Sequence, residues 1–234
     1  MKKLFVFDLD GTLCPIGKGM QPEHIQKLQE YEKQGVTIAL CSGKTAYYLC
    51  GFVRQMNLQS PWLIGENGAV LWKGIDLPPV HNEHMPFSDR AVRKLKELTR
   101  IVDERFAGRV WMQPNEVMLT PFFLDEATRD ALRELFQEQI LPGEGLHYYE
   151  FVDCFDVCPD GIDKSVGVRR LMELLPCTPE ECTDIGDSGN DYPMFALAGT
   201  SIGIGLTEPE RVTFPVRDLD EAFTILDRMA GPDK

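Results

Sequence analysis

Residues 4–12 read Leu4-Phe5-Val6-Phe7-Asp8-Leu9-Asp10-Gly11-Thr12. The continuous apolar run over residues 4–7 is typical of a strand buried on both faces of a parallel sheet. Two carboxylates follow where this strand ends, and ligands of doubly wound sheets bind at the carboxyl ends of their strands. The stretch therefore predicts an α/β fold whose first strand leads directly into a functional site.

Apolar runs alternate with helical patterns on both sides of the middle of the chain. We expect the first group of elements to be a helix over 22–34, a strand over 36–40, a helix over 45–57 and a strand over 62–64. The second group is a helix over 164–175, a strand over 183–185, a helix over 192–198, a strand over 201–204 and a helix over 219–229. This order predicts a doubly wound parallel sheet with helices on its faces.

The middle of the chain has a different pattern. A helix over 88–105 precedes two strands, 109–113 and 116–123, and a helix over 126–139 precedes strands 146–151 and 154–158. The order αββαββ predicts an antiparallel sheet with helices on one face. We expect residues 1–80 and 160–234 to form the α/β core, and residues 81–159 to form an inserted α+β domain.

Composition and charge exclude several kinds of partner. The 234 residues include 24 basic and 37 acidic side chains, a net charge of −13, which repels nucleic acid and anionic membrane surfaces. No apolar run approaches the roughly 18 residues of a membrane span. The seven cysteines include no CxxC pair, so we expect no disulfide framework and no zinc site, and a soluble protein of the reducing cytoplasm.

Asp8 and Asp10 form the first candidate site. Two carboxylates this close in a buried place raise each other's pKa, and a divalent cation would relieve that repulsion. Mg²⁺ prefers oxygen ligands, usually one or two carboxylates with waters and substrate phosphate. The alternative is a solvated turn marked by Asp10-Gly11.

A second acidic loop follows the strand expected over 183–185. It reads Gly186-Asp187-Ser188-Gly189-Asn190-Asp191, and parallel topology lets it face the first pair of carboxylates. An ordinary loop has the same composition, so the motif alone leaves both interpretations open.

Two further sites could bind a phosphoryl group. The Ser42 hydroxyl and the Gly43 N–H stand at the start of a helix, where they suit a phosphoryl oxygen, although an ordinary Ser N-cap is the alternative. Lys164 opens a later helix and could neutralise both the acidic cluster and a phosphate; the alternative is a solvated lysine.

Taken in order, these motifs resemble those of the haloacid dehalogenase superfamily: the DxDGT sequence at 8–12, Ser42, Lys164 and the GDSGND sequence at 186–191. The inserted αββαββ segment resembles the class IIB cap of its sugar-phosphatase-like branch, and residues 66–69 match a turn that this branch carries before its cap. The resemblance implies a Rossmann-like core and an aspartyl-phosphate mechanism.

By this resemblance, Asp8 is the nucleophile and Asp10 is the general acid and base. Mg²⁺ is held by the carboxylates of Asp8 and Asp187 and by the backbone carbonyl of Asp10. The non-bridging phosphate oxygens are bound by Ser42, the Gly43 N–H, Lys164 and Asn190. Asp191 supports the metal shell or pairs with Lys164.

Two residues depart from the branch's pattern. Lys44 stands where Arg is usual, which keeps the charge but loses the planar fork. Ser165 stands where Gly is usual after Lys164.

The function implied is a Mg²⁺-dependent phosphatase of a small phosphorylated metabolite, such as a sugar-phosphate-like monoester. One alternative is a phosphomutase of the phosphomannomutase-like type, and another is a non-catalytic binding protein on the same fold. The substrate stays open. We expect a monomer or a small homo-oligomer.

Overall fold

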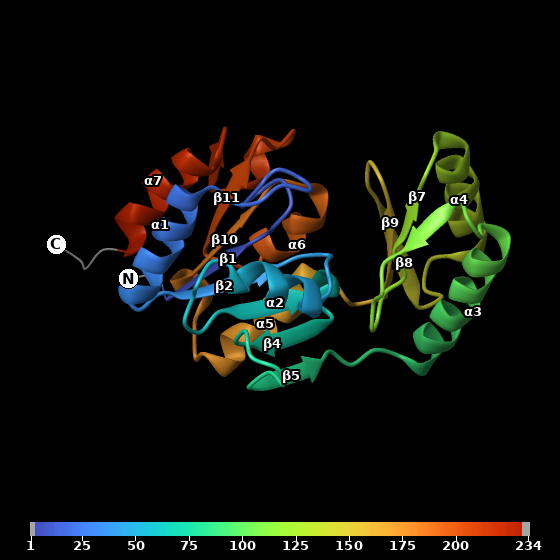
Figure 1. Ribbon diagram of the computed structural model, residues 1–234, viewed down its shortest axis with the longest axis horizontal. Helices are drawn as coiled ribbons and strands as arrows, with labels where there is room; N and C mark the ends of the chain where they lie inside the picture. The colour runs from blue at the N-terminus through green and yellow to red at the C-terminus, as the bar shows by residue number, and fades with distance from the viewer. Residues whose placement is uncertain (1–2, 231–234) are drawn as a thin grey trace. The chain divides into compact units, whose positions relative to one another are not determined.

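The run that opens the chain forms β1 (Leu4–Phe7), a fully buried strand inside an eight-stranded sheet. This computed structural model describes residues 3–230. The chain folds into two compact units (Figure 1). Unit 1 comprises the chain up to Met85 together with the chain from Asp163 onward, and unit 2 comprises Pro86–Ile162.

Unit 1 is built on the large sheet, whose strand order is β12-β11-β10-β1-β2-β3-β4-β5. The further strands are β2 (Thr37–Cys41), β3 (Trp62–Gly65), β4 (Val70–Lys73), β5 (His81–His84), β10 (Cys182–Gly186), β11 (Thr200–Ile204) and β12 (Phe214–Val216). All neighbours pair in parallel except β3 with β4 and β4 with β5. The sheet is therefore doubly wound as predicted, with two antiparallel strands added at one edge.

Helices cover this sheet. They are α1 (Pro22–Lys33), α2 (Ala46–Arg54), α5 (Lys164–Leu174), α6 (Tyr192–Phe195) and α7 (Leu219–Ala230), with short 3-10 turns η1 (Glu66–Gly68), η2 (Pro179–Glu181), η3 (Gly189–Asp191) and η4 (Pro209–Arg211). Helix α2 begins after Thr45, whose hydroxyl accepts a hydrogen bond from the Tyr48 N–H at 3.2 Å. Helices α1 and α7 lie side by side (Figure 1), and Tyr31 Oη donates to Asp227 Oδ1 at 2.7 Å.

Unit 2 has the predicted element order αββαββ. Its elements are α3 (Asp89–Arg105), β6 (Val110–Met112), β7 (Pro121–Phe123), α4 (Glu126–Gln139), β8 (Leu146–Glu150) and β9 (Phe155–Pro159). The pairs β6–β7 and β8–β9 are antiparallel, and isolated bridges from Leu119 to Val157 and from Phe122 to Cys154 connect the two pairs.

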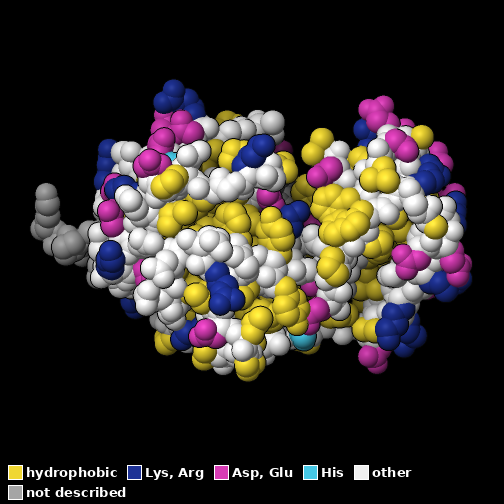
Figure 2. Space-filling view, in the orientation of Figure 1, with side chains coloured by type: hydrophobic (Ala, Val, Ile, Leu, Met, Phe, Trp, Pro, Cys, Tyr) yellow, Lys and Arg dark blue, Asp and Glu magenta, His cyan; other side chains and the backbone are white. Residues whose placement is uncertain are grey.

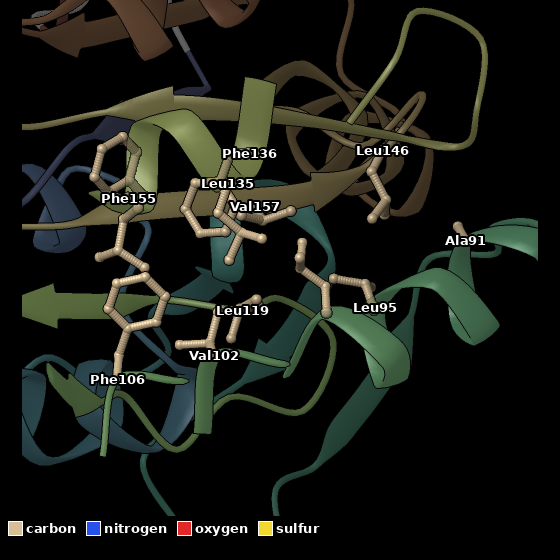
Figure 3. Packing of buried hydrophobic residues seen from close by; sticks show 12 residues of the cluster. Ala91, Leu95, Val102, Phe106, Leu119, Leu135, Phe136, Leu146, Phe155 and Val157 are labelled. Atoms are coloured by element: carbon tan, nitrogen blue, oxygen red, sulfur yellow. The ribbon is translucent and has the colours of Figure 1, made fainter. Parts of the chain in front are cut away.

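A hydrophobic core of its own holds unit 2 together (Figure 3). The ring of Phe136 from α4 meets the ring of Phe155 from β9 edge to face at 5.2 Å, and Leu98 and Val102 of α3 belong to the same cluster. On the face of unit 2 that Figure 2 shows, acidic and basic side chains are interspersed. Arg133 and Glu150 of this unit form an ion pair. Unit 2 thus has the separate core and the charged surface of an independent domain.

Three strands differ from the sequence-based expectation. β4, β5 and β12 were not predicted. β5 reads His-Asn-Glu-His and has no apolar residue, so only its pairing with β4 makes it a strand. This pairing puts residues 81–84 in unit 1, whereas the insert was expected to begin at residue 81. Its expected end was residue 159, and the compact unit ends at Ile162.

All seven cysteines are buried, and none of them forms a disulfide in residues 3–230. Within residues 3–230, none of the helices combines the length and apolar character that crossing a bilayer requires.

Candidate active site

The site lies at the carboxyl edge of the large sheet. β1 sits between β10 and β2, so the chain segments that leave these three strands start side by side. Asp8 follows β1 directly, and its N–H donates to the Ile185 carbonyl of β10 at 2.8 Å. The parallel topology thus brings together loops that are more than 170 residues apart in the chain.

A buried ion-pair triad occupies this edge. Lys164 Nζ donates to Asp8 Oδ1 at 2.6 Å and to Asp191 Oδ1 at 2.5 Å. The three residues are 1%, 5% and 0% exposed, respectively. Burial lowers the pKa of Lys164, but the carboxylates of Asp191 and Asp8 outweigh it and leave that pKa above its ordinary value. Lys164 is therefore a fixed positive charge, not a solvated lysine.

Backbone packing fixes the position of Lys164. Asp163 caps α5, since its carboxylate accepts from the N–H and the hydroxyl of Ser165 at 2.8 and 2.5 Å. A Cβ on Gly68 would lie 2.1 Å from the Asp163 carbonyl oxygen, and a Cβ on Gly167 would lie 3.0 Å from the Gly68 Cα. The two glycines let α5 approach η1 closely, which places Lys164 at the sheet edge. Ser165, a departure from the family pattern, is accommodated in the helix cap.

Asp191 organises the loop that contains it. Its Oδ2 accepts from the N–H groups of Asp187 and Ser188 at 2.9 and 3.0 Å, while its Oδ1 faces Lys164. A Cβ on Gly186 would lie 2.4 Å from Asp191 Oδ2, so this position requires glycine. Most of the acceptor capacity of Asp191 is thus used inside the protein, which suits a supporting carboxylate.

Asp187 is oriented by the motif that follows β1. The Thr12 hydroxyl donates to Asp187 Oδ1 at 2.7 Å. Gly11 has φ +92°, and a Cβ there would lie 2.3 Å from Asp187 Oδ2. Thr12 was not among the predicted site residues, although its place in the DxDGT sequence was a signal that could have identified it.

The carboxylates of Asp8, Asp187 and Asp191 form a group that fits a divalent cation. One oxygen from each lies within 4.8 Å of the others, and every donor is a hard carboxylate oxygen of the kind that Mg²⁺ binds. Ionised, the three carboxylates and Lys164 together carry a charge of −2. Burial raises the pKa of Asp8 despite Lys164, and burial also raises the pKa of Asp187. A divalent cation would balance the charge and keep both groups ionised.

Asp10 is placed apart from this group. Its side chain is 21% exposed, and its Oδ2 lies 3.7 Å from Lys44 Nζ. The predicted contact of Asp10 with the metal uses its backbone carbonyl and stays a prediction.

The predicted phosphate-binding residues line the neighbouring loops. Ser42 is 4% exposed, and its Oγ accepts from the Lys44 N–H at 3.2 Å; Gly43 lies between these two residues. Asn190 is 7% exposed, and its Nδ2 donates to Asn67 Oδ1 at 3.2 Å.

Asn67 joins the two loops and was not predicted to do so. Its N–H donates to the Ser42 carbonyl at 3.0 Å, while its side chain accepts from Asn190. Glu66, Asn67 and Gly68 have φ values of 51°, 50° and 98°, a strained run that turns the amide of Asn67 towards Asn190. The sequence signal was the Glu-Asn-Gly-Ala match at 66–69, which carried no role for Asn67.

Curated relatives match most of the chain. A phosphoglycolate phosphatase of Methanopyrus kandleri is 26% identical over 211 residues, 86% of this chain and 84% of the relative. A phosphoglycolate phosphatase of Metallosphaera sedula is 29% identical over 221 residues, 90% and 88% of the two chains. A 5-amino-6-(5-phospho-D-ribitylamino)uracil phosphatase of Bacillus subtilis is 24% identical over 209 residues, 87% of this chain and 84% of the relative.

Solved structures confirm the fold. A haloacid dehalogenase-like hydrolase of Bacteroides thetaiotaomicron superposes with a TM-score of 0.77 at 17% identity, covering 98% of this chain and all of that one. A sugar phosphatase of haloacid dehalogenase subclass IIB superposes with a TM-score of 0.74 at 17% identity, covering 97% and 99%. The model of the haloacid dehalogenase-like hydrolase family matches residues 5–122 and 112–212. The chain therefore belongs to the haloacid dehalogenase-like hydrolases, as the sequence motifs predicted.

Proposed function

We propose that this protein is a Mg²⁺-dependent phosphatase that hydrolyses a small phosphorylated metabolite, a sugar-phosphate-like monoester, through an aspartyl phosphate on Asp8. One observation carries the proposal. Asp8 is a buried carboxylate at the carboxyl edge of a parallel sheet, held at 2.6 Å by Lys164 and grouped with Asp187 and Asp191. We assign unit 1 as the catalytic core and unit 2 as the inserted domain.

In the first step, an Asp8 oxygen attacks phosphorus, and the bond from phosphorus to the ester oxygen breaks. The leaving oxygen keeps the electron pair and takes a proton from the Asp10 carboxyl group. In the second step, Asp10 accepts a proton from water as the water attacks phosphorus. The bond to Asp8 breaks, which releases inorganic phosphate and restores both carboxyl groups.

The remaining residues bind the phosphoryl group and limit its motion. Lys164 is fixed beside Asp8 and supplies positive charge next to the attacked phosphorus, while the Ser42 hydroxyl, the Gly43 N–H and the Asn190 amide are donors for the non-bridging oxygens. Asp8, Asp187 and the Asp10 backbone carbonyl would hold Mg²⁺. When bound, this ion supplies charge that offsets the repulsion between a carboxylate and a phosphate dianion.

The acidic character of the chain fits this proposal only with such local positive charge, because a net charge of −13 repels anionic metabolites. The names of the relatives support a phosphorylated small molecule as the substrate class. The predicted cytoplasmic location and oligomeric state stay predictions.

Phosphate release from a panel of phosphorylated metabolites tests the proposal. The panel is assayed with Mg²⁺ and with EDTA, for the wild type, for Asp8→Asn and for Asp103→Asn, an exposed aspartate of α3 that serves as the control. We expect turnover only with Mg²⁺ and only in the wild type and the control. Turnover by Asp8→Asn, or interconversion of hexose 1- and 6-phosphates without phosphate release, would contradict the proposal.

A further inference from the structure

Lys44 lies beside Asp10, which does not belong to the three-carboxylate group. Its Nζ is 3.7 Å from Asp10 Oδ2, and the two side chains are 25% and 21% exposed. Both are therefore more open to the solvent than the Asp8–Lys164–Asp191 triad, whose side chains are at most 7% exposed. At this distance the two groups attract each other, and the Asp10 carboxyl group stays open to the solvent.

The backbone of Lys44 is held from three directions. Its N–H donates to Ser42 Oγ at 3.2 Å, and its carbonyl accepts from the Glu66 N–H at 2.9 Å. A Cβ on Gly65 would lie 3.1 Å from the Lys44 carbonyl oxygen and 2.7 Å from the Ala46 nitrogen. The end of β3 therefore packs directly against the backbone of residues 44–46. The base of the side chain is thus fixed, and its ammonium ion reaches Asp10 from a defined direction.

The backbone of Asp10 is also fixed. The Gly11 N–H donates to the Cys14 carbonyl at 2.8 Å, and a bridge links Asp10 to Cys14. Because the backbone is fixed, the direction of the Asp10 carboxyl group depends on its side-chain torsion angles. Lys44 Nζ is a positive group that the ion pair places at that carboxyl group.

We propose that Lys44 is a positioning residue that holds the Asp10 carboxyl group towards the leaving-group oxygen. The inference rests on the proposed function, in which Asp10 gives its proton to that oxygen as the ester bond breaks. Lys44 contacts Oδ2, which leaves Oδ1 for the proton transfer. Lys44 then contributes to the reaction only through the placement of Asp10.

This role predicts a dependence on the leaving group. An alkoxide is a poor leaving group and needs the proton of Asp10, whereas 4-nitrophenolate leaves without it. Loss of Lys44 should therefore slow the transfer of phosphate from alkyl esters far more than from 4-nitrophenyl phosphate. The value of kcat/KM reports this first transfer, because it covers the steps up to the release of the leaving group.

The experiment measures kcat/KM with glycerol phosphate, 3-phosphoglycerate and 4-nitrophenyl phosphate for the wild type, Lys44→Met and Lys44→Arg. Lys33→Met is the matched control, because Lys33 is an exposed lysine at the end of α1 that precedes the amino end of β2. For Lys44→Met we expect kcat/KM on both alkyl esters to fall about 100-fold, and that on 4-nitrophenyl phosphate to fall less than about threefold. Lys44→Arg should recover most of the loss, and Lys33→Met should match the wild type.

Three outcomes would overturn the inference. An equal loss on all three substrates would mean a general structural role. If Lys44→Met lowers kcat/KM for 3-phosphoglycerate alone, and does so by raising KM, then Lys44 binds the substrate's carboxylate instead of positioning Asp10. Lack of any wild-type turnover would overturn the proposed function and this inference together, which separates that failure from the first two.

Discussion

The substitution Lys164→Met removes the ammonium ion that lies between Asp8 and Asp191. Methionine keeps an unbranched side chain of similar length, so it fills much of the same space. Two short contacts, at 2.6 and 2.5 Å, are lost at a position that is 1% exposed. The charge of the site, counted over Asp8, Asp187, Asp191 and residue 164, changes from −2 to −3.

The size of the effect follows from burial. Removing one partner of a buried ion pair costs about 3–5 kcal/mol, because the other charges stay behind without compensation. Bound Mg²⁺ should offset part of this loss, because the more negative site of the variant binds the cation more tightly and each tenfold gain in affinity restores about 1.4 kcal/mol in excess Mg²⁺. We therefore expect a large loss of unfolding free energy in EDTA and a smaller one in excess Mg²⁺.

The loss should also depend on pH. Burial raises the pKa of Asp8, and Lys164 opposes that rise, so the substitution raises this pKa further. A carboxyl group whose pKa is raised in the folded state stabilises the fold most below its unfolded pKa, and this contribution disappears as the pH rises through the folded value. The deficit of the variant should accordingly be larger at pH 8 than at pH 5.

Urea unfolding followed by circular dichroism measures these quantities for the wild type, Lys164→Met and the control Lys33→Met. The double variant Lys164→Met/Asp191→Asn completes a cycle, and it should lose less than the sum of its two single substitutions because it also removes one negative charge. A loss below about 1 kcal/mol in EDTA that does not change with pH would refute this account, since it would mean that Lys164 is not the main compensation for the buried carboxylates.

Three further predictions concern other parts of the molecule. Thr12→Val removes the 2.7 Å hydrogen bond to Asp187, and titration calorimetry should show Mg²⁺ binding weakened about 10- to 100-fold. Thr12→Ser keeps the hydroxyl and should bind Mg²⁺ as the wild type does. Phe136→Ala opens a cavity in the core of unit 2 and should cost about 3–5 kcal/mol of unfolding free energy, against less than about 1.5 kcal/mol for Phe136→Leu with repacking; equal losses would contradict the packing argument. Burial raises the pKa of Glu83, yet hydrogen bonds from Arg170 and His81 outweigh burial and hold this pKa below its usual 4.5. The ionised Glu83 therefore stabilises the fold above pH 4.5, and this contribution is lost as the pH falls through the folded pKa. Glu83→Gln should therefore cost below about 1 kcal/mol in urea unfolding at pH 7 and nothing at pH 3, and a loss that persists at pH 3 would argue against the ion pair.

Much of the fold could be predicted because burial leaves a pattern in the sequence. β1, β2 and β3 are buried along their whole length or nearly so, and each reads as a short, largely apolar run between helical patterns. The order αββαββ of unit 2 followed from amphipathic periodicity in α3 and α4. Two of the three strands that escaped prediction lack that signal: β12 is short, contains Pro215 and is mostly exposed, and β5 has no apolar residue. β4 reads Val-Leu-Trp-Lys and is buried over its first three residues, so the signal was present there and was missed.

Element ends were predicted less well because local hydrogen bonds decide them. The helix expected over 45–57 ends at Arg54, and Asn57 has φ 52°, outside the helical region. The strand expected over 116–123 forms only over Pro121–Phe123. In the loop before it, the side chains of Gln113, Asn115 and Thr120 hydrogen-bond to one another.

The candidate site, too, could be predicted only in part. The convergence of Asp8, Ser42 and Asp187 at one sheet edge could be predicted, because parallel strands share a direction and their carboxyl ends therefore meet. The contact between Asn67 and Asn190 spans 123 positions in the chain and depends on the backbone strain at Glu66 and Asn67, neither of which is visible in residue types.

The arrangement of charge explains how so acidic a chain could act on an anion. Lys164 is enclosed with Asp8 and Asp191, so its charge is little screened by solvent and offsets part of the negative charge beside the place where a group would bind at Asp8. Lys44 is partly exposed and meets Asp10 at 3.7 Å, so its charge is screened and its effect on a bound phosphate is weaker. Two lysines of equal charge therefore have different consequences: loss of Lys164 should change stability, metal binding and every substrate alike, whereas loss of Lys44 should be felt only where a proton must reach the leaving group. Burial, more than residue type, separates a lysine that supports the whole site from one that directs a single step.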